Sequence, residues 1–302
     1  MEAGARTRVA VAPPRVGSLR QVVSDYVDMT KPRVQSLLLF TTVTTMYVAG
    51  TPSLSRVVLT CLGGALSAGG AGAINHYLDR DIDAQMKRTA NRPVPSGRVA
   101  PGAALAWGIF LGSASFVLMA LTINLLAASL ALAGLLGYVV VYTIWLKRTT
   151  PQNIVIGGAA GAMPPLVAWA ATTGHLAGAA LYLFAIVFYW TPPHFWALSL
   201  LMKDEYASAG VPMLPVVRGE TETRWQILLY TLLLVGVTLL PVAFGVFDGI
   251  YLIAALLLGS AFTAMAIRLR RSAERRDALR LYLFSLAYLA LLFAAMVADA
   301  RL

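Results

Sequence analysis

The sequence predicts an all-α integral membrane protein, with nine transmembrane helices around a central cavity that opens to the cytoplasm. Composition is the first indication: of 302 residues, 58% are hydrophobic and 13% are charged, against roughly 25% charged residues in an ordinary soluble domain. The mean hydropathy is +0.71. The apolar residues form long segments without charge, and the basic residues gather on one side of those segments. A water-soluble globule, a disordered chain and a disulfide scaffold are excluded, the last because Cys61 is the single cysteine.

The charge-free segments set the number of helices, because a membrane span needs about 20 mostly apolar residues. Five segments are each about one span long: 34–55, 57–78, 225–247, 249–267 and 281–298. Two longer segments, 99–146 and 149–202, are each long enough for two spans. Turn-forming residues lie near their midpoints, at 122–124 and at 172–175. The sequence therefore predicts nine spans.

The basic residues orient these spans. All but Arg56 and Arg301 of the 24 Lys and Arg residues precede the first span or follow an even-numbered one. The positive-inside bias assigns those segments to the cytoplasm. The N-terminus is then cytoplasmic and, after nine crossings, the C-terminus lies outside. All but Asp248 and Asp299 of the 14 acidic residues fall on the inner side too, so we expect any chemistry there.

The first 32 residues are polar and basic, without the apolar run of a cleavable signal peptide. We expect residues 1–32 to form a cytoplasmic segment, with an amphipathic surface helix over 18–33, and residues 33–302 to form one nine-helix domain. A bacterial inner membrane is the expected location, because a mitochondrial homologue would carry a longer presequence. The net charge is +10, and the basic residues that produce it lie mostly on one side of the predicted spans. We therefore expect the chain to contact lipids and not nucleic acid.

Two diproline pairs lie within predicted spans, Pro164-Pro165 in the fifth and Pro192-Pro193 in the sixth. Each pair removes backbone donors at membrane depth, which is tolerated where the backbone is buried in protein or lines a cavity. We therefore expect both helices to be broken and to border an internal cavity.

The main chemical signal is the end of the second span. Asn75, Asp79 and Asp83 are spaced four residues apart and would share one face of a helix. Two carboxylates about 5–6 Å apart repel by ~3 kcal/mol at an effective dielectric constant near 20, and a divalent cation would remove that repulsion. Carboxylate and amide oxygens favour Mg²⁺ over zinc or copper.

Basic residues accompany this acidic face and predict an anionic substrate bridged by the metal, such as a diphosphate. The candidate diphosphate contacts are Arg33, Arg88, Arg92, Lys147 and Arg148. The alternative is a solvated charged loop that only orients the helix. That role needs the positive charges but not the aspartates.

A second polar cluster, with Asp204 and Glu205, closes the sixth span. Since the second and sixth spans are equivalent in a four-span repeat, these carboxylates are candidates for a second metal, or else form an ordinary interfacial cap. His194 lies at membrane depth, where an ionisable residue is a functional candidate, and His76 adjoins the acidic face. For both histidines a structural hydrogen bond is the alternative.

These residues resemble a known family. The strings that carry the resemblance are TKPRV (30–34), NHYLDRDID (75–83), RTANRP (88–93), YTIWLKRTTPQNIVIGG (142–158), PPHFW (192–196) and AGVPMLP (209–215). The first acidic motif resembles the intramembrane prenyltransferase (UbiA) superfamily, and the longer strings resemble its protohaem IX farnesyltransferase branch. Many superfamily members carry a full Asp-x-x-x-Asp as second motif, whereas here Asp204 and Glu205 are adjacent, so the resemblance does not say which of them binds metal.

The resemblance implies an Mg²⁺-dependent reaction of farnesyl diphosphate with haem B and water, giving haem O and diphosphate. It implies that Asn75, Asp79 and Asp83 are catalytic and hold the metal, and that His194, or less readily His76, binds haem or positions water. The implied partners are haem A synthase and the terminal oxidase that uses the product. The competing hypotheses are a UbiA-type enzyme of the quinone or chlorophyll pathway and a membrane transporter, whose site would lie near the midplane.

Overall fold

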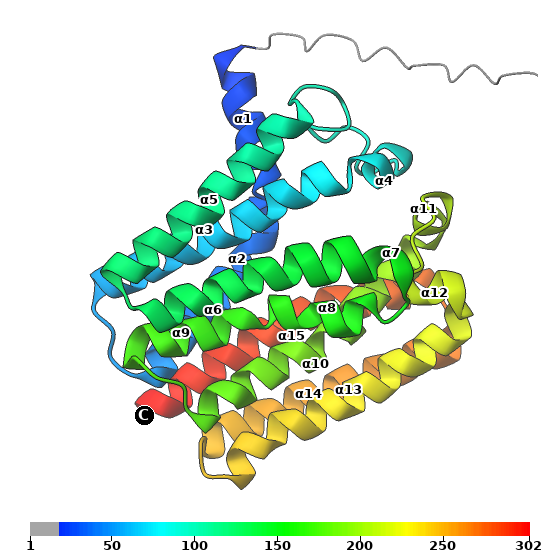
Figure 1. The fold of residues 1–302 in the computed structure, drawn as a ribbon. Helices are drawn as coiled ribbons and strands as arrows, with labels where there is room; N and C mark the ends of the chain where they lie inside the picture. Colours follow the sequence, from blue (N-terminus) through cyan, green and yellow to red (C-terminus); the bar gives the residue numbers. More distant parts are fainter. Residues whose placement is uncertain (1–17) are drawn as a thin grey trace, which may run out of the picture.

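The computed structural model describes residues 18–302, and every regular element in that part of the chain is helical (Figure 1). The predicted N-terminal segment is thus described only from residue 18. The Ser18 side chain caps α1 (Leu19–Met29) by accepting a hydrogen bond from the Gln21 amide at 3.3 Å. Lys31 then takes a left-handed conformation (φ 56°, ψ 56°), and α2 (Pro32–Ala49) begins at a proline.

The close contact of α3 (Leu54–Leu78) with α5 (Pro101–Thr122) depends on glycine. A Cβ atom at Gly70 would lie 2.7 Å from the carbonyl oxygen of Gly108, and one at Gly108 would lie 2.8 Å from that of Gly70. Small residues allow membrane helices to approach in this way. The contact fixes α3 just before its polar end, which leads into α4 (Arg80–Gln85).

The two long charge-free segments each turn where the sequence predicts. After α5, Asn124 caps α6 (Leu125–Leu136), its side chain accepting a hydrogen bond from the Ala127 amide at 2.7 Å. The second turn separates α9 (Met163–Thr173) from α10 (Gly178–Leu201).

The fourth predicted span is only partly α-helical. After α6 it continues as a π-helix, η1 (Gly137–Leu146), and ends in α7 (Lys147–Thr149). π-helical turns are rare and frequently occur at functional sites. Nothing in the apolar sequence of this span predicted the change.

The prediction of two broken helices is half wrong. The fifth span does divide, into α8 (Asn153–Gly161) and α9, but the break is at Ala162, so that Pro164 and Pro165 occupy the first turn of α9, where a missing donor costs little. The sixth span, α10, runs through Pro192 and Pro193 without interruption. Both prolines are buried in the bundle, where packing with neighbouring helices holds the chain helical.

The remaining helices complete the bundle. They are α11 (Lys203–Ser208), α12 (Leu214–Val217), α13 (Gly219–Ala243), α14 (Gly249–Ser272) and α15 (Arg275–Arg301). The last long helix packs against α2, where Arg301 Nη2 donates to the Tyr47 carbonyl oxygen at 2.8 Å. The short helices α4, α7, α11 and α12 gather at one end of the bundle, and the C-terminus lies at the other (Figure 1).

The predicted class, an all-α membrane protein, is confirmed. In the described chain, seven helical segments are long and apolar enough to cross a membrane. The two other long helices, α2 and α10, overlap the first and sixth predicted spans but are not among these seven. The count of nine crossings therefore stays a prediction.

Candidate active site

The predicted acidic face does not lie on one continuous helix. Helix α3 ends at Leu78, and Asp79 (φ −93°, ψ 8°) joins it to α4. The backbone nevertheless keeps helical spacing, because the Asp79 amide donates to the Asn75 carbonyl oxygen at 2.9 Å and the Asp83 amide to that of Asp79 at 2.7 Å. The side chains of Asn75, Asp79 and Asp83 are all buried, with 3%, 0% and 2% of each residue exposed.

Each of these three side chains meets a cation from a different segment. Lys31 Nζ donates to Asn75 Oδ1 at 2.6 Å. Lys147, at the end of η1, donates to Asp79 Oδ2. Arg92, in the loop after α4, donates to Asp83 Oδ2 at 2.7 Å. The structure thus joins four stretches of chain around one buried polar cluster.

The orientation of the Asn75 amide is fixed by its partners. Its Nδ2 donates to Asp79 Oδ2 at 2.6 Å and to Thr143 Oγ1 at 3.2 Å, while its Oδ1 faces Lys31. Because a carboxylate accepts and an ammonium donates, the reverse orientation would lose both charged partners. Thr143 belongs to η1 and is itself 1% exposed, so the π-helix contributes directly to the cluster.

The cluster carries more positive than negative charge. Asp79 and Asp83 are opposed by Lys31, Arg92 and Lys147. Burial and the nearby Arg92 and Lys147 lower the pKa of Lys31 to about 7, which is the direction expected where cations crowd together away from water. An anion at this point would relieve the repulsion.

One carboxylate oxygen in the cluster lacks a hydrogen bond. Asp79 Oδ1 is buried without a hydrogen-bond partner in the described part of the chain, and its charged neighbour Arg148 Nη2 stays 3.6 Å away. A buried unsatisfied carboxylate oxygen is costly, and a bound cation would satisfy it.

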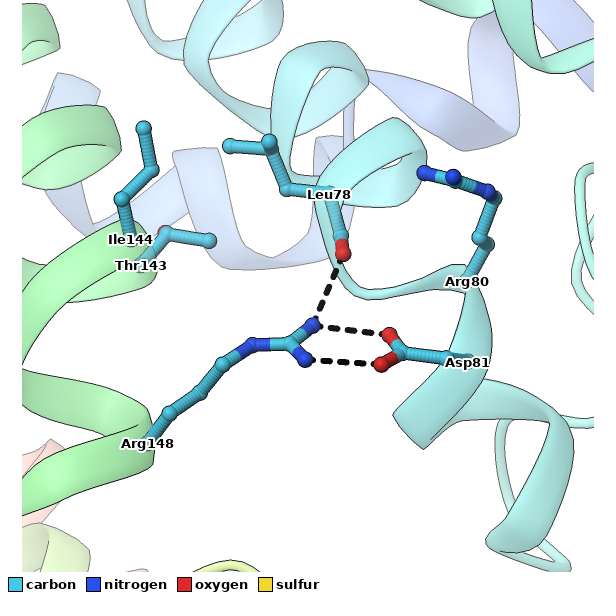
Figure 2. A pocket seen from close by; sticks show the side chains of 6 residues that line it. All are labelled: Leu78, Arg80, Asp81, Thr143, Ile144 and Arg148. Carbon is cyan, nitrogen blue, oxygen red and sulfur yellow. Dashed lines mark hydrogen bonds and ion pairs between the residues drawn. The ribbon is translucent and has the colours of Figure 1, made fainter.

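A groove of about 370 Å³ lies beside the cluster, between the end of α3, α4 and η1 (Figure 2). Arg148 reaches across it and makes two hydrogen bonds of 2.7 Å with Asp81, and its Nη2 also donates to the Leu78 carbonyl oxygen at 2.8 Å. The two hydrogen bonds from Arg148 lower the pKa of Asp81 to about 2. Thr143 lines the same groove, which therefore extends to the residue that holds Asn75.

The structure places the other predicted site residues less centrally. The Arg88 amide donates to Glu205 Oε2 at 3.4 Å, so α11 lies beside the loop that carries Arg92. The side chains of Arg88, Asp204 and Arg33 are exposed. Lys31 stands in the cluster instead of Arg33, although both belong to the string that begins the resemblance.

His194 lies deep in the bundle between two aromatic rings. Its ring stacks on Trp190 at 4.3 Å and on Tyr282 at 4.8 Å between centroids. Ser285 Oγ lies 2.7 Å from His194 Nδ1 and donates its own proton to the Tyr282 carbonyl oxygen. We infer that Nδ1 carries the proton of the neutral ring and that Nε2 keeps its lone pair for a ligand. The other candidate, His76, is 2% exposed, with an unpartnered Nδ1 among the described residues.

Sequence reasoning missed Lys31, Thr143 and Ser285 as members of these clusters. Lys31 belongs to the string TKPRV (30–34), but its contact with Asn75 depends on the left-handed turn before α2. Thr143 and Ser285 lie in apolar spans, where a single hydroxyl carries no pattern. Their positions follow from helix packing alone.

The fold and the site define a class of protein. Residues 37–292 match the UbiA prenyltransferase family, and the chain belongs to that family. The resemblance in the sequence is thereby confirmed. The fold agrees, because the chain superposes with a TM-score of 0.77, at 18% identity, on a structure described for digeranylgeranylglyceryl phosphate synthase, covering 93% of this chain and 99% of that one. A UbiA homolog from Archaeoglobus fulgidus bound to DMAPP and Mg²⁺ gives 0.67 at 17% identity, covering 90% and 99%.

More particular similarities come from relatives named protoheme IX farnesyltransferase. The chain is 56% identical over 280 residues to one from Roseiflexus sp. (strain RS-1), covering 92% of this chain and 52% of the relative. It is 54% identical over 283 residues to one from Symbiobacterium thermophilum, covering 92% and 95%. The chain thus spans about half the length of some of these relatives and nearly all of others.

Proposed function

We propose that this chain transfers a farnesyl group from farnesyl diphosphate, with addition of water, to a vinyl group of haem B, giving haem O and diphosphate. The observation that carries the proposal is the convergence of Lys31, Arg92 and Lys147 on a buried carboxylate cluster. The cluster lies in a chain closely similar to relatives named protoheme IX farnesyltransferase. Excess positive charge suits a diphosphate, and a carboxylate oxygen without a partner suits a metal.

The residues present fit Mg²⁺. Asn75, Asp79 and Asp83 offer hard oxygen ligands, including the unpartnered Asp79 Oδ1. Among the described residues no three His, Cys, Asp or Glu side chains converge as a metal site, so the protein would supply few ligands and the diphosphate and water the others, as is usual for Mg²⁺. Glu205, which lies beside the loop of Arg92, and Asp204 are the proposed ligands of a second ion. The bound metal would supply stabilisation of the leaving diphosphate's negative charge.

The chain's own cations would share that task. In the reaction the bond between the farnesyl carbon and the diphosphate oxygen breaks, and both bonding electrons leave with the diphosphate. Lys147, Arg92 and Arg148 lie where they can hold that charge, and fixed cations need no rearrangement as it develops. Arg33 and Arg88 are proposed as outer contacts, because their exposed side chains could meet the substrate at the rim.

The second half of the reaction needs an acceptor and a water molecule. The terminal vinyl carbon of haem B forms the new bond to the farnesyl carbon, the adjacent carbon takes a hydroxyl group from water, and one proton is released. His194 is proposed to bind the haem or to position that water through Nε2, because Ser285 already occupies Nδ1. His76 is the second candidate for this role.

The location and partners follow from the same proposal. The bias of basic residues supports a bacterial inner membrane, a cytoplasmic N-terminus and an outer C-terminus. The product is proposed to pass to haem A synthase or directly to a terminal oxidase.

The test is an assay of the purified full chain in detergent with haem B, farnesyl diphosphate and Mg²⁺, followed by mass spectrometry of the extracted haem. We expect a haem heavier by one farnesyl group plus one hydroxyl group, and loss of that product with EDTA. Product formation unchanged by EDTA would contradict the metal assignment. Unmodified haem together with prenylation of a quinone precursor would replace haem B by another acceptor, and absence of any transfer would contradict the proposed activity.

A further inference from the structure

Lys31 occupies the one Asn75 atom that a metal would need. Its Nζ lies 2.6 Å from Asn75 Oδ1 and 3.5 Å from the Tyr138 hydroxyl. The other amide atom of Asn75 already has Asp79 and Thr143 as acceptors. Since Nδ2 is a hydrogen-bond donor, Oδ1 is the only side-chain atom of Asn75 that can bind a cation. In this structure Oδ1 accepts a hydrogen bond from the Lys31 ammonium.

The backbone of Lys31 is held in a strained conformation. Its φ of 56° and ψ of 56° lie in the left-handed region, which in the described chain only one other non-glycine residue, Ala273, shares. Pro32 follows directly and starts α2. Strain of this kind persists where the surrounding structure enforces it, and it is common at functional sites. Here it joins the turn between α1 and α2 to a side chain that reaches the end of α3.

We infer that Lys31 is a displaceable cation. In the metal-free protein it holds the Asn75 amide in place, and on metal binding it releases Asn75 Oδ1 and pairs with the substrate diphosphate instead. An ammonium and a divalent ion cannot both bind this oxygen closely, because they would repel one another at short range. The inference rests on the proposed function, in which Asn75 is a metal ligand.

The charges in the cluster give this exchange a direction. With Lys31 protonated, the three cations Lys31, Arg92 and Lys147 exceed Asp79 and Asp83 by one positive charge. A divalent ion alone would raise that excess, whereas a prenyl diphosphate, with up to three negative charges, would offset it together with the ion. The metal and the diphosphate are therefore expected to strengthen each other's binding, with Lys31 as the residue that couples them.

The test uses Mn²⁺ as the metal probe, titrated into the purified full chain in detergent, and counts only the Mn²⁺ retained with the protein after ultrafiltration, because inorganic diphosphate also binds free Mn²⁺ in solution. In the wild type we expect weak binding of Mn²⁺ alone and at least ~10-fold tighter binding with inorganic diphosphate, in line with ordinary coupling between two ligands. Lys31→Met should bind Mn²⁺ alone ~10-fold more tightly and gain less from diphosphate than the wild type does, keeping only the coupling that comes from direct contact of diphosphate with the metal. Lys87→Met, which removes an exposed lysine from the neighbouring loop, is the charge-matched control and should behave as the wild type.

A second variant protects the test against misfolding. Lys31→Gly also removes the ammonium but suits the left-handed backbone, so it should reproduce the Mn²⁺ result of Lys31→Met without loss of thermal stability. Wild-type Mn²⁺ affinity and diphosphate coupling in both variants would overturn the inference. Unchanged Mn²⁺ binding in Asn75→Ala and Asp79→Asn would instead contradict the metal site of the proposed function.

Discussion

At the residue scale, Asp79 is the member of the cluster that depends most on its partners. Asp79 is fully buried, and its Oδ2 accepts hydrogen bonds from Asn75 and Lys147. Its Oδ1 has no hydrogen-bond partner among the described residues. A carboxylate buried in this way depends on its cations for charge and on a further ligand for its second oxygen. This makes Asp79 the most informative position for substitution.

Asp79→Asn removes the charge while keeping the shape. We expect farnesyl transfer to fall at least ~100-fold, in the range found when one fixed electrostatic contact is removed from an active site, and Mn²⁺ binding to weaken in parallel. Product formation measured by mass spectrometry, with helical content by circular dichroism, checks both. The matched control is Asp28→Asn on α1, whose side chain is exposed. Equal activity in the two variants would remove Asp79 from the mechanism.

Asp81 gives a prediction of pH dependence. Its pKa lies near 2 in the folded protein, below the ordinary value of 3.8, because of the two hydrogen bonds from Arg148. A lowered pKa means that the pair stabilises the fold fully above about pH 4, and that this contribution is lost as the pH falls through about 2. The two side chains are 57% and 37% exposed, so solvent limits the contribution to about 1 kcal/mol or less.

The measurement is the apparent unfolding temperature of the wild type and Asp81→Asn between pH 2 and pH 7. The variant should be slightly less stable at every pH above 4, and the difference should vanish near pH 2. A difference that grows as the pH falls would contradict the assigned direction of the pKa shift.

Residue spacing could predict which acidic side chains meet, but not all of their partners. The four-residue period of Asn75, Asp79 and Asp83 is local, and it survives the change of helix at Asp79. The contact of Asn75 with Lys31 joins residues 44 positions apart and depends on a left-handed turn that no residue pattern announces. Periodicity predicts the local contact, whereas the distant one requires the packed structure.

At the element scale, the close contact between α3 and α5 fixes the position of the end of α3, which carries Asn75. The Cβ that Gly108 lacks would lie 2.5 Å from Ile74 Cγ1, 2.8 Å from the Gly70 carbonyl oxygen and 2.9 Å from the Ile74 amide nitrogen. Ile74 directly precedes Asn75, so pressure at this contact is transmitted to the cluster. The backbone atoms cannot move aside without a shift of the helix.

Gly108→Ala should therefore destabilise the protein by about 1–3 kcal/mol, as overpacking of a close contact does, and should also lower farnesyl transfer. The control is Gly64→Ala on α3, where an added Cβ meets no atom within 4 Å and no loss is expected. Apparent melting temperatures in one detergent, with activity at a fixed temperature, check the pair. Similar behaviour of the two variants would contradict the close approach.

Helix boundaries were predictable where turn residues interrupt an apolar run, as at Asn124. They were not predictable where the helix changes type, as in η1, or continues through prolines, as in α10. The reason is that backbone hydrogen bonding in these spans is decided by neighbouring helices. Pro192 and Pro193 lie inside a helix buried in the bundle, whereas Pro164 and Pro165 start a helix after a break.

At the scale of the whole molecule, the site owes its place to the arrangement of spans. The short helices and loops with the acidic and basic side chains gather at one end of the bundle, and α15 returns to α2 so that the first and last long helices meet (Figure 1). Hydropathy and the distribution of basic residues predicted this division from sequence, because both report the membrane directly. Hydropathy marks seven helical segments in the described chain as spans, and α2 and α10 are not among them.

The prediction of nine transmembrane crossings can be tested, because an odd number of crossings puts the two ends of the chain on opposite sides of the membrane. With Cys61 replaced by serine, single cysteines can be placed at exposed positions on either side of all the spans, Ser24→Cys on α1 and Leu302→Cys at the C-terminus. Nine crossings put these on opposite sides of the membrane, so a membrane-impermeant maleimide on intact cells should label Leu302→Cys and spare Ser24→Cys, and permeabilised cells should label both. If one of α2 and α10 did not cross, the number would be even and the two termini would lie on one side. A further cysteine, Thr51→Cys after α2, decides which helix is responsible: labelled in intact cells it requires α2 to cross, whereas protection would show that α2 stays on the inner side.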